Sequence, residues 1–269
     1  MRLASEAFVK VWGSPHTEPW FQNSGKQKIG EIWFKASDRL PLLVKLLFTE
    51  DNLSVQDHPD DTYARAHHQS RGKTEMWHVL RAQPGAGVWL GLKDPTLSRA
   101  QLNTACITGE VVNLLNWYPA NAGDTFFVPA GTIHAIGAGL VICEIQQLSD
   151  ITYRLYDWGR QPLRELHLED GLRVARFESH SGAIARRDLG NSRQLLAECP
   201  YFTTERLEVT GSMLCPAPAG NTIYIAVEGE GTIAGAPFRQ GEAWEIGAGA
   251  QPFEICSPAA VFLTTTESA

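Results

Sequence analysis

Four polar side chains in this sequence of 269 residues could together bind a metal ion: Gln56, His58, Glu75 and His134. They offer one amide oxygen, two imidazole nitrogens and one carboxylate. Such a mixed set of nitrogen and oxygen ligands suits Zn²⁺ or another borderline divalent cation, and it leaves room for water or substrate, as a catalytic metal requires. The four residues are distant in the sequence, so the fold must bring them together.

The segment 53–58 is expected to be a strand that presents two of these residues. It reads Leu-Ser-Val-Gln-Asp-His, and the two-residue period of a strand puts Ser54, Gln56 and His58 on one face. Asp57 then points to the opposite face. Taken alone, Gln56 could also be the polar end of an edge strand, so its assignment depends on the other segments.

The segment 72–78 is expected to be a second such strand. Its sequence Gly-Lys-Thr-Glu-Met-Trp-His puts Lys73, Glu75 and Trp77 on one face and His78 on the other. Like Gln56, Glu75 could by itself be the polar end of an edge strand. His67, His68 and His78 lie in no motif, and we expect none of them to be a ligand.

A turn and strand pattern surrounds His134. Gly123 and Asp124 predict a turn, residues 125–128 a short strand, and Pro129-Ala-Gly131 a second turn that places His134 on the next strand. The spacing of glycine, five residues, proline, one residue, glycine, two residues and histidine resembles the second half of the cupin signature. In cupins this histidine is a metal ligand inside a small β-barrel, so the resemblance implies the same for His134.

Further motifs narrow the resemblance to one family. In their order and composition they are similar to the type I mannose-6-phosphate isomerases, zinc-dependent cupin enzymes that interconvert mannose 6-phosphate and fructose 6-phosphate. The resemblance covers about residues 29–160. The matching motifs are Ser54-Val-Gln-Asp-His-Pro-Asp-Asp61, Gly72-Lys-Thr-Glu-Met-Trp77, Pro129-Ala-Gly-Thr-Ile-His-Ala-Ile136 and Glu144-Ile-Gln-Gln-Leu-Ser-Asp-Ile-Thr-Tyr-Arg154.

The resemblance implies roles for individual residues. It makes Gln56, His58, Glu75 and His134 the ligands of one zinc ion per chain, although another divalent metal is possible, and it makes Arg154 the catalytic arginine. The positions that would line the pocket and bind the sugar phosphate are Lys45, Ser54 and Lys73, with Arg154.

Two features depart from the family pattern. Asp57 stands where a small apolar residue is common, but strand parity points it away from the expected metal ligands. The chain is also short and lacks the helical insertion of longer members of the family. The rim of the pocket, and with it the choice of substrate, is therefore the part that the resemblance predicts least.

The chemistry of aldose-ketose isomerisation fits these residues. Moving a carbonyl from C1 to C2 through a cis-enediol requires a Lewis acid, a proton shuttle and charge stabilisation for the enediolate. Arg154 shares its strand face with Thr152 and Tyr156, and a planar cation there can stabilise an enediolate or hold a phosphate bidentately. The alternative is an ordinary surface arginine on an edge strand.

Two lysines could also act in such a site. Lys73 shares a face with Glu75 and would serve as a catalytic proton carrier or as a phosphate counter-charge. Lys45 interrupts the apolar run 42–48 and could have the phosphate role, or it could extend to solvent at a sheet edge. The proton-transferring base remains open between Lys73, Glu144 and a metal-bound water.

The pattern of short β-rich runs between glycine and proline turns predicts an all-β fold. We expect a double cupin of two β-barrels or jelly rolls, with a short helical excursion in the first barrel at residues 96–104 and 108–114. All eight histidines lie at or before His180, so the second barrel is expected to have no histidine-based metal site.

The expected domain division has four parts. Residues 1–28 would be an irregular N-terminal arm, residues 29–160 the metal-binding catalytic cupin barrel, residues 161–190 a connecting segment, and residues 191–269 a second cupin-like β-domain.

The composition limits the class of partner. A net charge of −7 and a pI near 5.6 argue against nucleic acid or an anionic membrane surface. Five cysteines without a close C-x-x-C pair, and the lack of a signal peptide, predict unpaired thiols and a cytoplasmic protein. No apolar run is long enough to cross a bilayer. We expect a small-molecule sugar phosphate as partner, and a monomer or homodimer.

Two other functions remain possible. A metal-dependent cupin oxygenase would need a redox-active metal and typically a second histidine early in the first motif, where this sequence has Gln56. A non-catalytic sugar-phosphate-binding cupin would keep the barrel but lose metal ligands or Arg154, all of which are present here. Because cupins have many functions, the fold alone does not choose among them.

Overall fold

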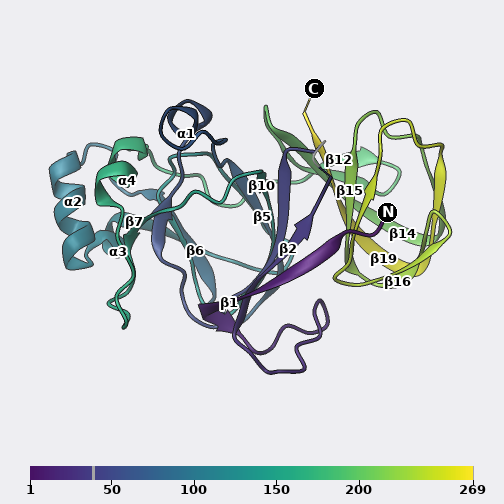
Figure 1. Ribbon diagram of the computed structural model, residues 1–269, viewed down its shortest axis with the longest axis horizontal. Helices are drawn as coiled ribbons and strands as arrows, with labels where there is room; N and C mark the ends of the chain where they lie inside the picture. The colour runs from purple at the N-terminus through teal and green to yellow at the C-terminus, as the bar shows by residue number, and fades with distance from the viewer. Residues whose placement is uncertain (38–39, 269) are drawn as a thin grey trace.

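The computed structural model describes residues 1–37 and 40–268 of the chain. Within these residues the strands form antiparallel sheets of six, five and eight strands. Figure 1 shows a first β-domain, with helices on its outer side, next to a second β-domain that contains strands β12 to β19. The predicted all-β class is confirmed.

Two sheets that face each other make up the first domain. The six-stranded sheet has the order β1-β2-β3-β10-β5-β8, and the five-stranded sheet has the order β11-β4-β9-β6-β7. The elements are β1 (Ala4–Ser14), β2 (Ile29–Lys35), β3 (Leu42–Phe48), β4 (Val55–Asp57), α1 (Asp61–His68), β5 (Glu75–Ala82), β6 (Gly87–Leu92), α2 (Arg99–Thr108), α3 (Val111–Leu114), β7 (Leu115–Pro119), β8 (Thr125–Val128), β9 (His134–Ile136), β10 (Leu140–Gln147), β11 (Tyr153–Tyr156) and α4 (Leu168–Val174).

Apolar side chains from both sheets fill part of the space between them. Strands β5 and β8 contribute Trp77, Val79 and Phe126, and strand β6 contributes Val88 and Leu90. One face of each of these strands points into the barrel. Glu75 shares its face with Trp77 and Val79 and is also buried, so this interior contains polar side chains as well.

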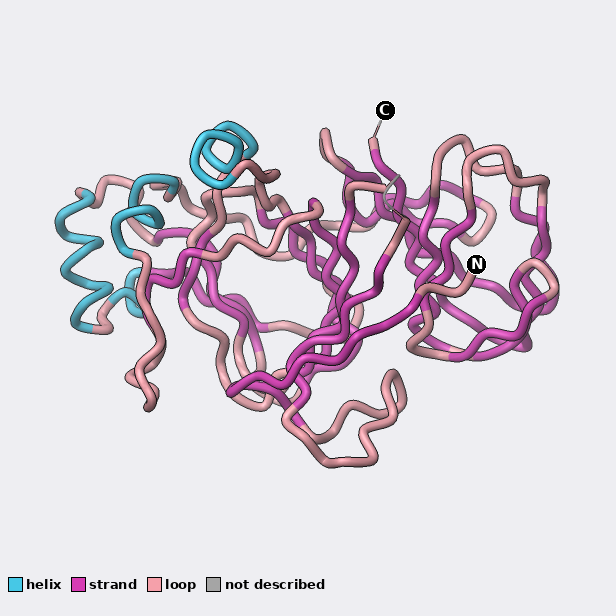
Figure 2. Tube along the Cα trace, in the orientation of Figure 1, coloured by secondary structure: helices cyan, strands magenta, loops and turns pink. Residues whose placement is uncertain are grey.

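Helices α2, α3 and α4 cover the outer face of the five-stranded sheet, on the left in Figure 2. Ser98 begins α2 with a capping box to Gln101, and Gly109, with φ of 84°, ends it in the left-handed conformation that glycine adopts without strain. The predicted helical excursion is confirmed. Both of its helices begin three residues later than expected, at Arg99 and Val111.

Helices α1 and α4 were not predicted. Helix α1 starts directly after the first motif, where the Asp60 side chain accepts a hydrogen bond from the Tyr63 backbone N–H and caps the helix. Asp61 accepts hydrogen bonds from the Gly72 backbone N–H and from Gln147, so it ties the helix to the second motif. Among the residues described here, no helix is long and apolar enough to span a membrane.

Strand β3 is buried on both faces. It lies between β2 and β10. Leu42, Val44 and Leu46 point outward into the core shared with the second domain, whereas Leu47 points into the first barrel. Lys45 is on the same face of β3 as Leu47, so its side chain points into the barrel. The alternative that it extends to solvent at a sheet edge is wrong.

The N-terminal residues do not form the irregular arm that was predicted. Residues 4–14 are strand β1, which pairs with β2 at the edge of the six-stranded sheet. The preceding residues also pair with the second domain: Leu3 donates its backbone N–H to Ala243, and Glu245 donates to Met1. The strand was missed because its outer face is exposed and a bulge after Phe8 breaks its alternation.

The second domain is built on an eight-stranded sheet, with β16 and β17 attached to the path β12-β13-β14-β19-β15-β18. Its interior contains apolar side chains such as Val209, Ile233, Phe238 and Phe262. Its strands are β12 (Arg187–Gly190), β13 (Arg193–Glu198), β14 (Phe202–Cys215), β15 (Thr222–Glu228), β16 (Glu230–Ile233), β17 (Ala236–Arg239), β18 (Ala243–Ile246) and β19 (Phe253–Glu267).

One apolar core joins the two domains. Phe34 and Val44 of the six-stranded sheet belong to the same buried cluster as Phe202, Ile223 and Leu263 of the eight-stranded sheet. Burial of this kind contributes roughly 25 cal/mol for each Å² of apolar surface removed from water. The back of the six-stranded sheet is thereby held rigidly while its front faces the barrel interior.

Candidate active site and metal centre

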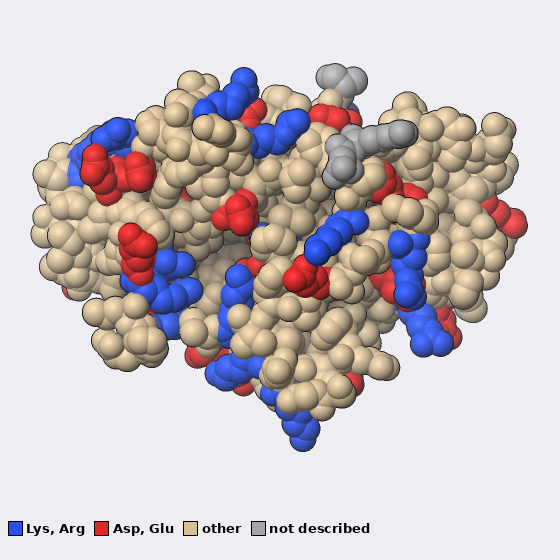
Figure 3. Space-filling model, in the orientation of Figure 1, with Lys and Arg blue, Asp and Glu red and all other residues tan. Residues whose placement is uncertain are grey.

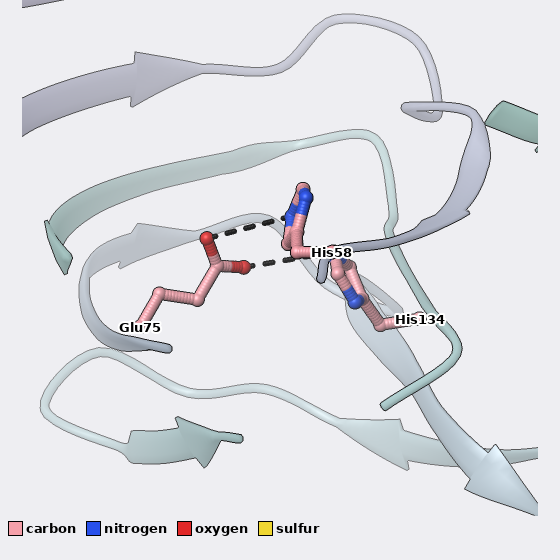
Figure 4. A group of neighbouring side chains, drawn as sticks. All are labelled: His58, Glu75 and His134. Carbon is pink, nitrogen blue, oxygen red and sulfur yellow. Dashed lines mark ion pairs between the residues drawn. The ribbon is translucent and has the colours of Figure 1, made fainter. Parts of the chain in front are cut away.

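Three of the predicted metal ligands meet inside the first barrel. Figure 4 shows the carboxylate of Glu75 pointing toward the rings of His58 and His134. Glu75 begins β5, His134 begins β9 and His58 follows β4 directly. Glu75 Oε2 lies 3.7 Å from His58 Nε2, and Glu75 Oε1 lies 3.6 Å from His134 Nε2. One ligand atom from each residue falls within 4.8 Å of the others, and all three residues are buried.

The fourth predicted ligand, Gln56, reaches the same centre. It is the register partner of His134 across β4 and β9, and its amide nitrogen lies 3.4 Å from His134 Nε2. Ser54, two residues earlier on the same face, donates a hydrogen bond of 3.0 Å to Gln56 Oε1. The structure thus brings together all four residues that the sequence placed on three separate strands.

Backbone carbonyls orient both imidazole rings. His58 Nδ1 lies 2.8 Å from the carbonyl oxygen of Ile151, and His134 Nδ1 lies 2.8 Å from that of Thr132. A carbonyl can only accept, so each Nδ1 carries the proton and each Nε2 turns its lone pair toward the centre. This is the arrangement that metal-binding histidines commonly have.

Burial keeps these rings neutral. It is the largest cause that lowers the pKa of His134 to about 4 and the pKa of His58 well below its usual value, with Lys73 acting in the same direction on both. Burial also raises the pKa of Glu75 to about 7, although Lys73 opposes that rise. Two neutral imidazoles and a desolvated carboxylate fit a divalent cation, which would supply the missing positive charge.

Two buried ion pairs border the centre. Lys73 Nζ lies 2.9 Å from Glu75 Oε2 and 3.2 Å from His58 Nε2, so it contacts two proposed ligands. Lys45 Nζ lies 3.1 Å from Glu144 Oε1, and both side chains are about 6% exposed. Lys45 also lies over the ring of Trp33, 4.6 Å from its centroid. Each buried ammonium therefore has a carboxylate partner, as burial of a charge requires.

The predicted substrate-binding residues line one cavity of about 340 Å³. Figure 3 shows charged side chains around a hollow in the first domain. The cavity walls come from strands that face the barrel interior and from the segment after β11. Its lining includes Lys10, Trp12, Glu31, Trp33, Lys45, Ser54, Gln56, Lys73, Glu144, Asp150, Thr152, Arg154 and Arg164.

Arg154 lies on the edge strand β11, but its side chain lines the cavity. It is the register partner of Gln56 across β11 and β4. One Nη donates 2.8 Å to the backbone oxygen of Glu165, while Nε is buried without a hydrogen-bond partner in the part of the chain that the structure describes. Burial, followed by the nearby charge of Arg164, lowers the pKa of Arg154. The Arg154 side chain thus lines the cavity wall with one of its donors still without a partner among the described residues.

Some cavity residues were missed by sequence reasoning. Lys10 and Trp12 come from β1, which was taken as an irregular arm, and Glu31 comes from β2. Arg164 comes from the connecting segment, where its guanidinium donates 2.7 Å from Nε to Asp157 Oδ2. The only signal in the sequence was the charge density of that segment. The long-range pairing that brings β1 to the cavity leaves no local pattern.

Asp57 faces away from the centre, as parity predicted. It is fully buried, both carboxylate oxygens lack a hydrogen-bond partner within residues 1–37 and 40–268, and burial raises its pKa well above the usual value. The side chain points toward α4, where a Cβ added to Gly171 would lie 3.2 Å from Asp57 Oδ1. His67, His68 and His78 take no part in the metal centre.

Comparison with known proteins identifies the family. The family model for the catalytic domain of type I phosphomannose isomerases matches residues 16–76. Mannose-6-phosphate isomerase ManA of Bacillus subtilis is 37% identical over 221 residues, which cover 76% of this chain and 68% of the relative.

Solved structures share the fold. A crystal structure of the mannose 6-phosphate isomerase from Bacillus subtilis matches with a TM-score of 0.90 at 24% identity, covering 98% of both chains. A zinc-bound mannose 6-phosphate isomerase matches with a TM-score of 0.77 at 16% identity, covering 100% of this chain and 99% of the other. With the family model, the sequence identity and the shared fold in agreement, the chain belongs to the type I phosphomannose isomerase family.

Proposed function

We propose that this chain is a metal-dependent isomerase that interconverts mannose 6-phosphate and fructose 6-phosphate through an enediol. One observation supports this most strongly. The cavity that contains Lys45, Lys73 and Arg154 also reaches Gln56, which touches the centre of His58, Glu75 and His134. Cationic side chains for an anionic substrate and a potential Lewis-acid site therefore meet in one enclosed space.

The metal is proposed to be one Zn²⁺ per chain, held by Gln56, His58, Glu75 and His134. Two imidazoles, a carboxylate and an amide oxygen are ligands that Zn²⁺ accepts. When bound, the ion would supply Lewis-acid polarisation of the sugar carbonyl and hydroxyl oxygens. The remaining chemistry falls to the side chains of the cavity.

The balance of charge suggests where the phosphate binds. Lys45 is paired with Glu144, Lys73 with Glu75, and Lys10 with Glu31. On the opposite side, Asp157 is shared between Arg160 and Arg164, and the Arg154 side chain donates to the backbone oxygen of Glu165, with no carboxylate partner among the described residues.

The excess positive charge therefore lies with the arginines. We infer that the phosphate is held on this side, with Arg164 assisting Arg154 through bidentate hydrogen bonds. Lys45 and Ser54 would then contact the sugar and its phosphate from the wall formed by β3 and β4.

Arg154 and Lys73 are the proposed catalytic residues. Arg154 lies across the strand pair from Gln56, so its guanidinium is placed to stabilise the negative charge of an enediolate. Lys73 touches Glu75 and His58 at 2.9 and 3.2 Å and would move a proton at a substrate oxygen. Glu144, which is paired with Lys45, and a metal-bound water are the alternative proton carriers.

We also propose the arrangement of the whole chain. Residues 29–160 would form the catalytic cupin, residues 161–190 the connection and residues 191–269 a cupin-like domain without a metal, while residues 1–28 would supply β1 to the cavity wall. The protein would act in the cytoplasm on a free sugar phosphate, as a monomer or homodimer.

A coupled assay tests this function. Purified protein is given mannose 6-phosphate, and fructose 6-phosphate is measured in untreated protein, after chelation and after zinc is added back. We expect the protein to form fructose 6-phosphate, to lose this activity on chelation and to regain it when zinc is added. Binding of the substrate without turnover by fully metallated protein would instead indicate a sugar-phosphate-binding cupin.

A further inference from the structure

The second domain contains a cavity larger than the one that holds the catalytic residues. Its volume is about 510 Å³, compared with about 340 Å³ in the first domain. It lies at one end of the second barrel, which we call its mouth, and it is lined by strands β13, β14, β15 and β19 and the loop at residues 216–219. This domain is at the right in Figure 1. Small-molecule sites typically have volumes of about 300–1,000 Å³.

A row of hydroxyl groups crosses three neighbouring strands at this mouth. Thr203 of β14 is the register partner of Thr266 on β19, and Thr266 is the partner of Thr222 on β15. Register partners in antiparallel strands point to the same face, so the three side chains stand side by side. All three line the cavity.

A second polar row follows two residues deeper. Glu205 of β14 pairs with Thr264 of β19, which pairs with Tyr224 of β15. These residues also line the cavity, and Tyr224 is only 8% exposed. Arg193 of β13 is the register partner of Leu207 one row deeper, but its side chain reaches this row: its Nε and Nη2 each donate a 2.8 Å hydrogen bond to the carboxylate of Glu205.

The next row is apolar, which marks the floor of the site. It consists of Leu207, Phe262 and Ala226 in the same register, all within the core of the second domain. Trp244 extends the second polar row as the partner of Tyr224, and its indole N–H is buried without a hydrogen-bond partner in the described part of the chain. The apolar floor and the two polar rows thus surround one cavity, which has hydrogen-bonding groups along its wall.

The chemistry of the polar rows selects a ligand class. Hydroxyl groups of threonine and tyrosine both donate and accept, the carboxylate of Glu205 accepts and the guanidinium of Arg193 donates. Glu205 and Arg193 neutralise each other, so the cavity offers no net charge to an anion such as a phosphate. The best match is a neutral molecule that has many hydroxyl groups and an apolar ring or chain face for the floor.

We propose that the second β-domain has a binding site for a neutral monosaccharide or polyol, separate from the catalytic cavity. Arg193, Glu205 and Tyr224 would hydrogen-bond the ligand, and the hydroxyls of Thr222, Thr264 and Thr266 would surround it. The site does not depend on the proposed isomerase activity.

Methionine methyl groups allow a direct test, because the chain has three methionines. Met213 lines the cavity, Met76 lies in the core between the domains, and Met1 is exposed at the N-terminus. The full-length protein is labelled with ¹³C-methyl methionine and titrated with D-mannose and, separately, with mannitol. The same titrations are repeated with saturating mannose 6-phosphate to occupy the catalytic cavity.

We expect at least one of the two probes to shift the Met213 resonance in a saturable way. The shift should persist with mannose 6-phosphate present, and the Met76 resonance should not move. Glu205→Gln and Tyr224→Phe should each weaken the binding about tenfold, the usual effect of removing one hydrogen bond from a polar site. Glu208→Gln on the same strand is the matched control, because Glu208 is exposed outside the cavity. It should bind as the wild type does.

Two results would overturn the proposal. One is a Met213 resonance that neither probe moves in a saturable way, while the spectrum shows a folded protein. The other is a shift of the same midpoint in wild type, Glu205→Gln and Tyr224→Phe, since binding that ignores both polar groups cannot occur at this site.

Discussion

The two β-domains use the same strand alternation but fill their interiors differently. The first barrel buries Lys45, Lys73, Glu75 and Glu144 next to two histidines. The second barrel has an apolar interior with threonines and one ion pair, Arg193 and Glu205, only at its mouth. Histidine is absent from the second domain altogether. The difference shows that the barrel architecture itself does not determine the chemistry inside it.

Buried charges cost stability, and the first domain carries most of them. Moving a charge out of water costs several kcal/mol, which a partner charge only partly restores. The first domain meets this cost by pairing every buried lysine with a carboxylate, and by packing the back of β3 against the second domain. The second domain thus contributes apolar burial to the back of the sheet whose front carries these charges. The following predictions address this division of roles.

The metal centre should fail completely when a ligand is removed. His134→Ala is expected to lose bound metal and at least about 10³-fold of turnover together, because the other groups cannot replace a neutral imidazole at that position. Elemental analysis of the purified protein and the coupled assay measure both quantities. His67→Ala, an exposed histidine on α1, is the control and should change neither. Stoichiometric metal in His134→Ala would show that the ligand assignment is wrong.

Loss of the cavity arginine should affect turnover but not the metal. Arg154→Ala is expected to lower kcat about 10²- to 10³-fold, the usual effect of removing one donor that stabilises charge in the transition state. Metal content should stay that of wild type. Arg187→Ala, an exposed arginine at the start of the second domain, should retain full activity. Unchanged turnover in Arg154→Ala would remove this residue from the mechanism.

Breaking a buried ion pair should destabilise the first domain. Lys45→Met leaves Glu144 buried with its nearest cation removed, and we expect a loss of about 3 kcal/mol in the free energy of unfolding. Denaturant titration measures it. The double variant Lys45→Met, Glu144→Gln removes both charges and should recover most of that loss. A double variant as unstable as the single one would mean that packing, and not charge, explains the effect.

Asp57 offers the smallest and opposite effect. Its carboxylate is buried without a partner, so Asp57→Ala should raise the free energy of unfolding by about 1 kcal/mol. Asp51→Ala, at an exposed surface position, is the matched control and should change stability little. The metal content of both variants must also be measured and be equal, because Asp57 lies between the proposed ligands Gln56 and His58 in the sequence. A clear loss of stability in Asp57→Ala would reveal a structural role for this carboxylate.

Much of the fold followed from local patterns. The strand at 125–128 has the bounds that its turns predicted, because Gly123 and Pro129 border it. Parity also put Gln56 and His58 on one face of their strand, and Glu75 on one face of its own, without any long-range information. That these faces meet was implied by the family resemblance. Residues near each other in the sequence were therefore the predictable part.

The remainder depended on tertiary packing. Strand β1 has an exposed outer face and a bulge, and only its pairing with β2 brings Lys10 to the cavity. Arg164 reaches the cavity through its ion pair with Asp157, seven residues away in an irregular segment. Helix α1 was missed because its residues are mostly polar and leave little apolar periodicity, Ala64 being its one buried residue. None of these features has a local sequence pattern strong enough to predict it.

The central claim is that the first domain alone holds the catalytic metal. Anomalous diffraction at the zinc edge, from crystals of the protein purified with zinc, tests it most directly. We predict one strong anomalous peak, bound by His58, Glu75 and His134 next to Gln56, and no peak in the second domain. A fully metallated crystal whose zinc peak lies away from these residues, or is coordinated by side chains of the second domain, would contradict the account.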